Sequence, residues 1–459
     1  MIEGLKPYPK YKNSGQPWLG AVPAEWDVRR GKWLFQNRKE LNTYRANKNV
    51  LSLTLRGVVN NDPDDPEGLV PKDYATYQLF KKGDLVFKLI DLENLRTSRV
   101  GLVHEDGIMS SAYVRLIPRN GGNIRFFFHQ YFDLYARGVY NQIGAGVRST
   151  LGAPDLLDVG ILVPPREEQH AIVRFLDHAN GRIERAIRAK KKLIALLNEQ
   201  KQATTHHAVT RSLAPNVPLK FSDIPWLGDI PKHWDVLRSK YVFREVDDRS
   251  ATGQETRLSM SQKLGLVPSS KIEVKRLVSE SAVGSKICET GDLVLNRLKA
   301  HLGVFALASV RGLVSPDYTI LRPARAMCPR YFELIYRTPA CRVELRKRAK
   351  GIVQGFWRLY TDDFYDIRVP VPPVPEQERI VKQLDVDLIA LNTATARTER
   401  EIELLREYRT RLVADVVTGQ LDVRDAAIKL PDENLVDAET ISDPGNVEPE
   451  EVAFAEVEG

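Results

Sequence analysis

The sequence predicts an α+β protein with two globular domains in tandem, each followed by a long helix, the two helices pairing as an antiparallel coiled coil. Three observations lead to this prediction. A stretch of the chain recurs 208 residues later, short β-like segments fill the middle of each copy, and apolar residues at helical spacing close each copy. A solenoid unit has roughly 20–50 residues, so a period this long indicates a whole duplicated domain with its linker.

The duplication is clearest in an opening segment rich in Trp and Pro. PWLGAVPAEWDVRRGKWLF begins at Pro17 and PWLGDIPKHWDVLRSKYVF begins at Pro225, and the two match at 11 of 19 positions without a gap. Tryptophan can stack on bases, but Trp and Pro at matched sites are more typical of residues that seal a core. We therefore expect a core role for the shared tryptophans, which are Trp18, Trp26, Trp226 and Trp234.

Short strands are predicted in the middle of each copy. Apolar runs separated by Gly, Asp and Pro turns are typical of strands. They lie at residues 84–87, 100–103 and 112–117 in the first copy and at 292–295, 303–306 and 317–321 in the second. Shorter helical segments are expected near Ile124–Ala136 and Pro329–Arg348. Each copy thus has the composition of an α+β globule.

A long helix is predicted after each globule. The segments ILVPPREEQ and VPVPPVPEQ stop the preceding structure, and because Pro and Glu suit a first helical turn, the helices should begin at about Arg166 and Pro375. The apolar positions that follow are Ile172, Leu176, Ala179, Ile183, Ala186, Leu193 and Leu197, then Leu388, Leu391, Thr395, Ile402, Leu405, Leu412 and Val416. Faces this narrow favour a coiled coil. The alternative is two exposed helices, each packed on its own globule.

Basic side chains run along both helices. Lys190 and Arg409 fall at polar positions of the apolar seams and weaken the pattern. The basic residues expected on the outer faces are Arg182, Arg185, Lys190, Lys191, Lys192, Arg397, Arg400, Arg406 and Arg409. Solvation explains such a face as well as partner docking or phosphate contact does.

The predicted division of the chain has five parts. They are a first globular domain (1–165), a first helix (166–212), a second globular domain (213–374), a second helix (375–422) and an acidic, disordered tail (423–459). Pro431 to Gly459 carries ten acidic residues and neither Lys nor Arg, so the rest of the chain has 67 basic against 50 acidic residues, a net charge of +17. A body this basic attracts polyanions, above all nucleic acid.

Several function classes lack their motifs in this chain. Three cysteines without C-x-x-C spacing suit a reducing cytoplasm and give no sign of a zinc site. No run approaches 18 apolar residues, so we expect neither secretion nor a membrane span. The chain has no Walker A loop, no H-E-x-x-H and no [ND]-P-P-[YF] motif of an amino-methyltransferase. These absences predict a binding protein without a catalytic site or a metal site.

The doubled motifs resemble the DNA-specificity subunit of type I restriction–modification enzymes. The resemblance rests on P-W-L-G-x-x-P-x-x-W-x-V, on G-D-L-V followed by S-[SP]-[AD]-Y, and on V-P-P-x-x-E-Q, each present twice and in order between about Pro17 and Val423. It implies two target-recognition domains that each read one half of a split double-stranded DNA site, with the helices as spacer. The acidic loop Asn60–Glu67 and the acidic tail depart from that pattern.

The resemblance also implies partners. Members of the family are non-catalytic and recruit two methyltransferase subunits, then nuclease/translocase subunits. S-adenosylmethionine, ATP and Mg are expected on those partners and no cofactor on this chain. The alternative function is a coiled-coil scaffold that holds partner proteins, with DNA binding incidental. A standalone enzyme would need turnover by the purified chain.

Recognition residues should lie where the two copies differ, because the halves of a target differ. Basic, amide or aromatic side chains in Gly-containing or turn-like surroundings are the candidates, since such groups contact phosphates and base edges. They are Arg56, Lys88, Arg96, Arg99 and Arg148 in the first domain and Lys263, Asn296, Arg297, Lys299, Gln354, Trp357 and Arg358 in the second. Trp357 is expected to be exposed and could stack on or wedge between bases. Any one of these side chains could instead be an ordinary surface residue.

Overall fold

A computed structural model of the chain describes two compact units. The described residues are 5–55, 57–62, 71, 73–90, 92, 98–119, 121–143, 151–214, 216–261, 264–272, 282–351 and 357–431. Unit 1 holds the described residues up to Lys190 and those from Arg400 to Pro431, and unit 2 holds those from Lys191 to Glu399. The division falls inside both long helices, so each unit contains a piece of each. The domain limits inferred from the sequence follow the helix ends instead and stay a prediction.

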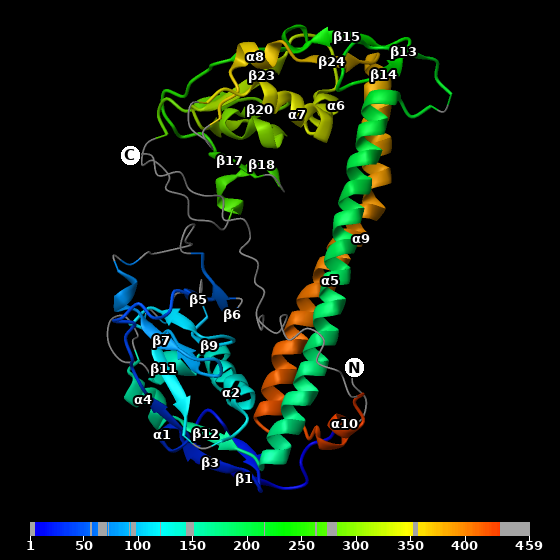
Figure 1. The fold of residues 1–459 in the computed structure, drawn as a ribbon. Coiled ribbons are helices and arrows are strands. Elements are labelled where there is room, and N and C mark those ends of the chain that lie inside the picture. Colours follow the sequence, from blue (N-terminus) through cyan, green and yellow to red (C-terminus); the bar gives the residue numbers. More distant parts are fainter. Residues whose placement is uncertain are drawn as a thin grey trace. The chain divides into compact units, whose positions relative to one another are not determined.

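Unit 1 is built on a four-stranded antiparallel sheet in the order β4-β11-β8-β9 (Figure 1). Its elements are β1 (Tyr11–Asn13), β2 (Ala21–Pro23), β3 (Asp27–Arg30), α1 (Gly31–Leu34), β4 (Phe35–Asn37), β5 (Leu51–Thr54), β6 (Gly57–Asn60), η1 (Tyr74–Thr76), β7 (Gln78–Phe80), β8 (Leu85–Phe87), β9 (Val100–Leu102), β10 (Gly107–Met109), β11 (Val114–Pro118), α2 (Ile124–Ala136), α3 (Val139–Ile143), α4 (Ala153–Asp158), β12 (Gly160–Val163) and α10 (Arg424–Ile428).

Unit 2 repeats this plan, with the antiparallel sheet β16-β23-β20-β21. Its elements are β13 (Leu219–Phe221), β14 (Asp229–Pro231), β15 (Asp235–Arg238), η2 (Ser239–Tyr241), β16 (Phe243–Val246), β17 (Leu258–Ser261), β18 (Gly265–Pro268), η3 (Ser269–Lys271), β19 (Lys286–Cys288), β20 (Leu293–Asn296), η4 (Arg297–Leu302), β21 (Phe305–Leu307), β22 (Gly312–Val314), β23 (Tyr318–Pro323), α6 (Pro329–Tyr336), α7 (Pro339–Arg348), α8 (Thr361–Tyr365) and β24 (Arg368–Val371).

The two-stranded pairings are duplicated as well. β3 pairs with β12, β5 with β6 and β7 with β10 in unit 1, and β15 pairs with β24, β17 with β18 and β19 with β22 in unit 2. In the first of these pairs the register is preserved at an offset of 208 residues, since Arg30 faces Gly160 and Arg238 faces Arg368. The sequence repeat is therefore a repeat of topology and, at this pair, of register.

The shared tryptophans lie where the sequence places them, in the cores. Trp26 and Trp234 are fully buried, and Trp18 and Trp226 are partly buried against the same clusters. Trp26 packs edge-on against Phe126 of α2, and Trp234 packs edge-on against Tyr331 of α6. Edge-to-face packing of this kind adds to the stabilisation from burial itself. The predicted core role is confirmed.

The repeated Glu-Gln pair fixes the start of each long helix. The Gln169 side chain donates to the carbonyl of Pro164 (2.9 Å) and accepts from the N–H of Asn123 at the start of α2 (2.9 Å). Gln377 does the same with Pro372 (2.8 Å) and Cys328 (2.9 Å). Each buried glutamine therefore ties three segments together, which explains why both copies keep it.

The long helices are α5 (Arg166–Arg211) and α9 (Val374–Val417), and they run antiparallel. In unit 1 Glu184 pairs with Arg409 and Lys190 pairs with Glu401, so partner numbers fall as α5 numbers rise. In unit 2 the end of α5 shares a core cluster with the start of α9. Along α9, residues at alternating spacings of four and three from Leu384 to Val416 are buried or half-buried, a heptad pattern. The predicted coiled coil is confirmed.

Three details of the helix prediction are wrong. Leu193 is 45% exposed, and Ile194 takes its place on the seam. Lys190 and Arg409 do not lie on the outer faces, since both are seam residues paired with glutamates of the other helix. Long side chains can bury their methylenes in a seam while the charged head meets a partner, so basic character alone does not predict an outer face.

The helical segment predicted over Pro329–Arg348 is broken. α6 ends at Tyr336 and α7 starts at Pro339, because proline cannot donate the backbone bond that would continue α6. Thr338 caps α7 by accepting from the N–H of Cys341 (3.3 Å). The segment Ile124–Ala136 is helical over its predicted length. Most of the acidic loop and residues 432–459 of the predicted tail lie outside the described residues. The start of that predicted tail is a helix, α10 (Arg424–Ile428), where disorder was expected.

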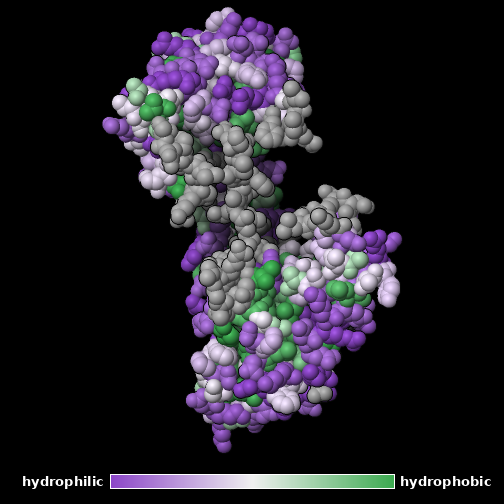
Figure 2. Space-filling view, turned by 90° about the vertical axis from the view of Figure 1, so that its left-hand side faces the viewer, coloured by the Kyte–Doolittle hydropathy of each residue, from purple (hydrophilic) through white to green (hydrophobic). Residues whose placement is uncertain are grey.

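Figure 2 shows mostly hydrophilic residues on the visible face, with smaller hydrophobic groups between them. Among the described residues, no helix is both long enough and apolar enough to span a bilayer.

Candidate nucleic-acid interface

Five of the twelve predicted recognition residues have no described position. Arg56, Arg96, Arg148, Lys263 and Gln354 lie outside the described residues. The other seven can be placed, two in unit 1 and five in unit 2.

Lys88 and Arg99 continue the β8–β9 pairing of unit 1. The N–H of Lys88 donates to the carbonyl of Arg99 (3.0 Å). The Arg99 side chain is only 1% exposed and Lys88 is half-buried. A buried guanidinium cannot contact a base edge without moving outward, so Lys88 is the better placed of the two.

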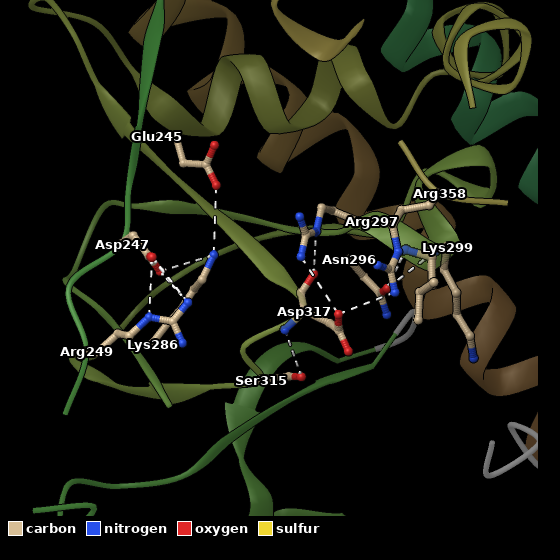
Figure 3. A network of polar contacts seen from close by, with 11 residues as sticks. Glu245, Asp247, Arg249, Lys286, Asn296, Arg297, Lys299, Ser315, Asp317 and Arg358 are labelled. Carbon is tan, nitrogen blue, oxygen red and sulfur yellow. Dashed lines mark hydrogen bonds and ion pairs between the residues drawn. The ribbon is translucent and has the colours of Figure 1, made fainter. Parts of the chain in front are cut away.

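Asn296 ends β20 and shapes the residues that follow. Its side-chain oxygen accepts from the N–H of Leu298 (3.1 Å) and of Lys299 (3.3 Å), which caps the 3₁₀ segment η4. This capping and the burial of Asn296 make it a residue that orients Arg297 and Lys299. The Lys299 side chain points away from Asp317 (Figure 3).

Arg297 and Arg358 meet at one carboxylate. Arg297 donates from Nε to the backbone carbonyl of Asp317 (2.8 Å), and its Nη2 lies 3.7 Å from Oδ1 of the same residue. Arg358 Nη2 lies 3.4 Å from that oxygen (Figure 3). Two residues 61 positions apart in sequence are thus brought together at the start of β23. Two cations on one carboxylate leave a net positive charge there.

The backbone holds this arrangement. Lys350 and Arg358 exchange both backbone hydrogen bonds (2.9 and 2.8 Å), and the N–H of Leu359 donates to the carbonyl of Arg297 (3.1 Å). Backbone hydrogen bonds therefore connect Lys350 to Arg358, and Leu359 to Arg297 of η4.

The sequence predicted an exposed Trp357, but its side chain is not freely exposed. The ring is partly buried, and the guanidinium of Arg346 lies 4.9 Å from its centroid. A cation over one face occupies a surface on which a base could stack. The nearby glycines predicted exposure, but the residue that faces the Trp357 ring, Arg346, lies in α7. No local sequence pattern reveals this contact.

Figure 3 also shows a second charged network of unit 2. Lys286 is buried and lies between Glu245 (3.8 Å) and Asp247 (3.4 Å), and Arg249 also contacts Asp247 (Figure 3). Here the carboxylates balance the cations. The Asp317 cluster is the more positive of the two.

Asp317 is the residue that the sequence analysis missed. The available signal was the motif S-[SP]-[AD]-Y, in which Ala112 stands in the first copy where Asp317 stands in the second. The residues one and two places beyond G-D-L-V-[FL] differ as well, Lys88 and Leu89 against Asn296 and Arg297. Matched strand ends therefore carry different side chains on the same frame.

Within the described part of the chain, no group of three or more His, Cys, Asp or Glu residues could hold a metal ion. The thiols of Cys288 and Cys341 are buried. Burial raises the pKa of Cys288 to about 11, so this thiol stays protonated at neutral pH.

Comparisons with known proteins agree with this organisation. The family model described as "Type I restriction modification DNA specificity domain" matches residues 27–193. The protein named "Putative type I restriction enzyme MjaX specificity subunit", from Methanocaldococcus jannaschii, is 21% identical over 438 residues, which are 90% of this chain and 98% of that protein. The type I restriction enzyme EcoKI specificity subunit of Escherichia coli strain K12 is 21% identical over 302 residues, 62% of this chain and 63% of that protein.

A solved structure has the same fold. It is described as "Structural basis underlying complex assembly and conformational transition of the type I R-M system", and it matches with a TM-score of 0.61 at 16% identity, covering 86% of this chain and 98% of the other. The family model and the full-length relative indicate a DNA specificity subunit of a type I restriction–modification system, and the solved structure shows the same fold.

Proposed function

We propose that this specificity subunit reads a bipartite DNA site, with unit 1 contacting one half and unit 2 the other. The predicted domains 1–165 and 213–374 act as the two target-recognition domains. One observation carries the proposal. The two units have sheets of the same topology, but the residues at corresponding strand ends differ: Leu89 and Ala112 in unit 1, and Arg297 and Asp317 in unit 2. A common frame suits duplex DNA as a common ligand, and different side chains suit different bases.

Unit 2 offers the better described reading site. The guanidinium groups of Arg297 and Arg358 both lie near the Asp317 carboxylate, and Lys299 points away from this carboxylate. A held guanidinium suits the paired acceptors of guanine in the major groove, and a lysine suits phosphate. In unit 1 we assign DNA contact to Lys88 and to the candidates Arg56, Arg96 and Arg148.

The chain works as an adaptor in this proposal. It recruits two methyltransferase subunits and then nuclease/translocase subunits, which carry S-adenosylmethionine, ATP and Mg, and it acts in the cytoplasm without chemistry of its own. The coiled coil of α5 and α9 serves as spacer between the two reading sites. The description of the solved relative, which concerns assembly of a type I system, supports such partners.

The test starts from the methylated adenines of the host genome, which should define a split motif. The purified chain with its methyltransferase partner is then titrated with duplexes in which one half or the other is scrambled. Each half should matter, and affinity should fall steeply with salt, because phosphate contacts release counterions. Sequence-blind binding that moderate salt abolishes would favour the scaffold alternative instead.

Arg358→Gln separates base reading from general charge. Loss of one bidentate base contact costs about 1–3 kcal/mol, so discrimination at one half-site should fall roughly 5- to 150-fold while the other half is read as before. Arg311→Gln is the matched control, since Arg311 is an exposed arginine of unit 2 paired with Glu289 (2.9 Å). If both variants weaken binding equally at both halves, Arg358 does not read bases.

A further inference from the structure

The two units share an exposed surface patch that their cores do not explain. We call it the matched patch. It consists of Arg30, Lys32, Trp33 and Asp158 in unit 1 and, 208 residues later in each case, Arg238, Lys240, Tyr241 and Asp366 in unit 2. All eight residues are exposed, with Trp33 at 67% and Tyr241 at 57%.

The matched patch has the same backbone support in both units. The N–H of Gly31 donates to the carbonyl of Val159 (3.0 Å), and the N–H of Ser239 donates to that of Ile367 (2.7 Å). In unit 1 the patch lies on β3, α1 and the end of α4, which Figure 1 places away from β5 and β6. In unit 2 it lies on β15, η2 and the residue after α8, away from β17 and β18.

Its ion pairs are repeated as well. Arg30 and Lys32 each lie 3.0 Å from Asp158, and Arg238 lies 3.6 Å from Asp366. The hydrogen bond from Lys32 keeps the pKa of Asp158 below its usual range, so that carboxylate stays charged. Exposed pairs add little to stability, typically about 0–1 kcal/mol. Stability therefore does not account for their presence in both copies.

An exposed aromatic ring at the same place in both units calls for a common reason. Shared buried residues build a common core, and residues that read bases have to differ between the halves of a target. A shared exposed ring suits a partner that both units meet in the same way. Aromatic and Arg side chains are enriched where proteins bind proteins, and they carry much of the binding energy there.

The exposed rings of the matched patch, more than its charges, favour a protein as this partner. Surfaces that bind phosphates are predominantly positive, because every contact neutralises an anion. Each half of the matched patch has one carboxylate beside two cations, Asp158 with Arg30 and Lys32 and Asp366 with Arg238 and Lys240, so only one positive charge is left over in each half. In unit 2 the patch also borders a hollow lined by Leu237, Tyr241 and Arg325, where a partner side chain could be seated.

We propose that the matched patch is a docking surface for one protein that binds the chain in two copies, one on each unit. This inference rests on the proposed function, in which the protein present in two copies is the methyltransferase subunit. The partner should offer an apolar pocket for the ring of Trp33 or Tyr241 with a carboxylate near Lys32 or Lys240. Two matched patches on one chain then set the number of methyltransferase copies.

Native mass spectrometry of the full-length chain with purified methyltransferase subunits tests this proposal. The unchanged chain should bind two copies. Trp33→Ala should weaken one copy and Tyr241→Ala the other, each by about 10- to 100-fold, which is typical for loss of an aromatic anchor. The double variant should bind neither copy at concentrations where the unchanged chain binds both.

The controls are exposed aromatics outside the matched patch. Tyr44→Ala in unit 1 (94% exposed) and Phe221→Ala in unit 2 (74% exposed) should keep both copies. All four side chains are largely exposed, so circular dichroism and thermal unfolding should be unchanged in every variant. A loss caused by misfolding would appear in those measurements.

The remaining outcomes separate the two proposals. If the unchanged chain binds no methyltransferase subunit, the proposed recruitment fails and this inference fails with it. If the unchanged chain and both patch variants bind two copies with equal affinity, only the docking surface is wrong. If DNA binding falls while both copies stay bound, the matched patch contacts DNA and the docking proposal is overturned.

Discussion

Arg322 donates from Nε and Nη2 to the two carboxylate oxygens of Asp292, at 2.9 and 2.8 Å. In unit 1 Arg115 donates to Asp84 at 2.6 Å. The aspartates are those of the repeated Gly-Asp-Leu-Val, and each also accepts a backbone N–H from three residues earlier, Lys81 (2.7 Å) or Glu289 (2.8 Å). The motif aspartate thus joins a turn to the neighbouring strand, which gives the repeat a structural reason.

Removing the aspartate should be more costly in unit 1 than in unit 2. Arg115 is 3% exposed, so Asp84→Ala leaves a buried guanidinium without its closest carboxylate and should lower the free energy of unfolding by about 3–5 kcal/mol. Arg322 is more exposed and also lies 3.6 Å from Asp248, so Asp292→Ala should cost less. Urea unfolding measures both variants. Asp27→Ala, which removes an exposed pair with Arg29, is the control and should cost under about 1 kcal/mol.

Ser239→Ala should destabilise unit 2. The Ser239 hydroxyl lies 2.8 Å from the Tyr336 hydroxyl and donates to the carbonyl of Ile367 (2.9 Å), and all three groups are buried. Without it the Tyr336 hydroxyl loses its partner, at a cost of about 1–3 kcal/mol. Hydrogen exchange of η2 and α6 would show the loss. Unchanged protection there, with the variant well folded, would mean that water replaces the serine.

His129 should make the protein sensitive to mild acid. Burial, and then the charge of Arg125, lower the pKa of His129 to about 3, so the folded protein keeps it neutral while the unfolded chain protonates it below its ordinary value of 6.5. The unfolded state then binds more protons between about pH 6.5 and 3, and stability falls as pH falls through that window. Between pH 7 and 5 the loss should be about 2 kcal/mol, because each pH unit below the ordinary pKa costs about 1.4 kcal/mol.

The residue of unit 2 that corresponds to His129 is Leu334, which suggests His129→Leu as the control variant for the acid sensitivity. Leu334 stands in α6 where His129 stands in α2, in the aligned runs Phe-Phe-His-Gln-Tyr and Phe-Glu-Leu-Ile-Tyr. His129→Leu should reduce the fall in unfolding free energy between pH 7 and pH 5 by that amount, measured by urea titration at each pH. An equal fall in the variant and the unchanged chain would assign the acid sensitivity to other groups.

Removing one partner of the Glu184–Arg409 ion pair should lower the stability of the helix pair, whereas replacing both residues with apolar ones should not. Arg409 is only 4% exposed and donates to Glu184 across the two helices. Glu184→Ala should lower the stability of the helix pair by about 1–3 kcal/mol, because it leaves the guanidinium unpaired in the seam. Arg409→Leu together with Glu184→Ala should restore stability or raise it. Thermal unfolding of both variants decides, and a double variant weaker than the single would contradict this account.

Local patterns were sufficient for the frame of the molecule. Proline followed by Glu-Gln marks the starts of α5 and α9, because proline ends one element and suits the first turn of the next. Apolar residues at 3-4 spacing predicted the coiled coil but misplaced Leu193, since a one-residue drift of the seam leaves the spacing rule satisfied. Pro339 marks the α6–α7 break in the sequence, although one helical region is predicted there.

The candidate site depended on contacts that no local pattern encodes. Arg297 and Arg358 were singled out separately for their turn-like surroundings, and only the folded chain brings both to Asp317. Arg346 covers Trp357 from a different helix, and Arg99 is buried although its neighbours suggest a turn. Exposure is set by packing between distant segments, and composition near a residue does not report it.

The sequence by itself determined the duplication, the fold class, the two long helices and the family, because these follow from periodic spacing and from motifs repeated 208 residues apart. Only the tertiary structure decided which basic residues face outward, which carboxylate holds Arg297 and Arg358, and that Trp33 and Tyr241 stay exposed beside repeated ion pairs. The physical reason is the separation along the chain of the residues that decide each feature. Helix starts and seams are set by neighbours a few residues away, whereas the burial and pairing of a charge depend on segments that meet only after folding.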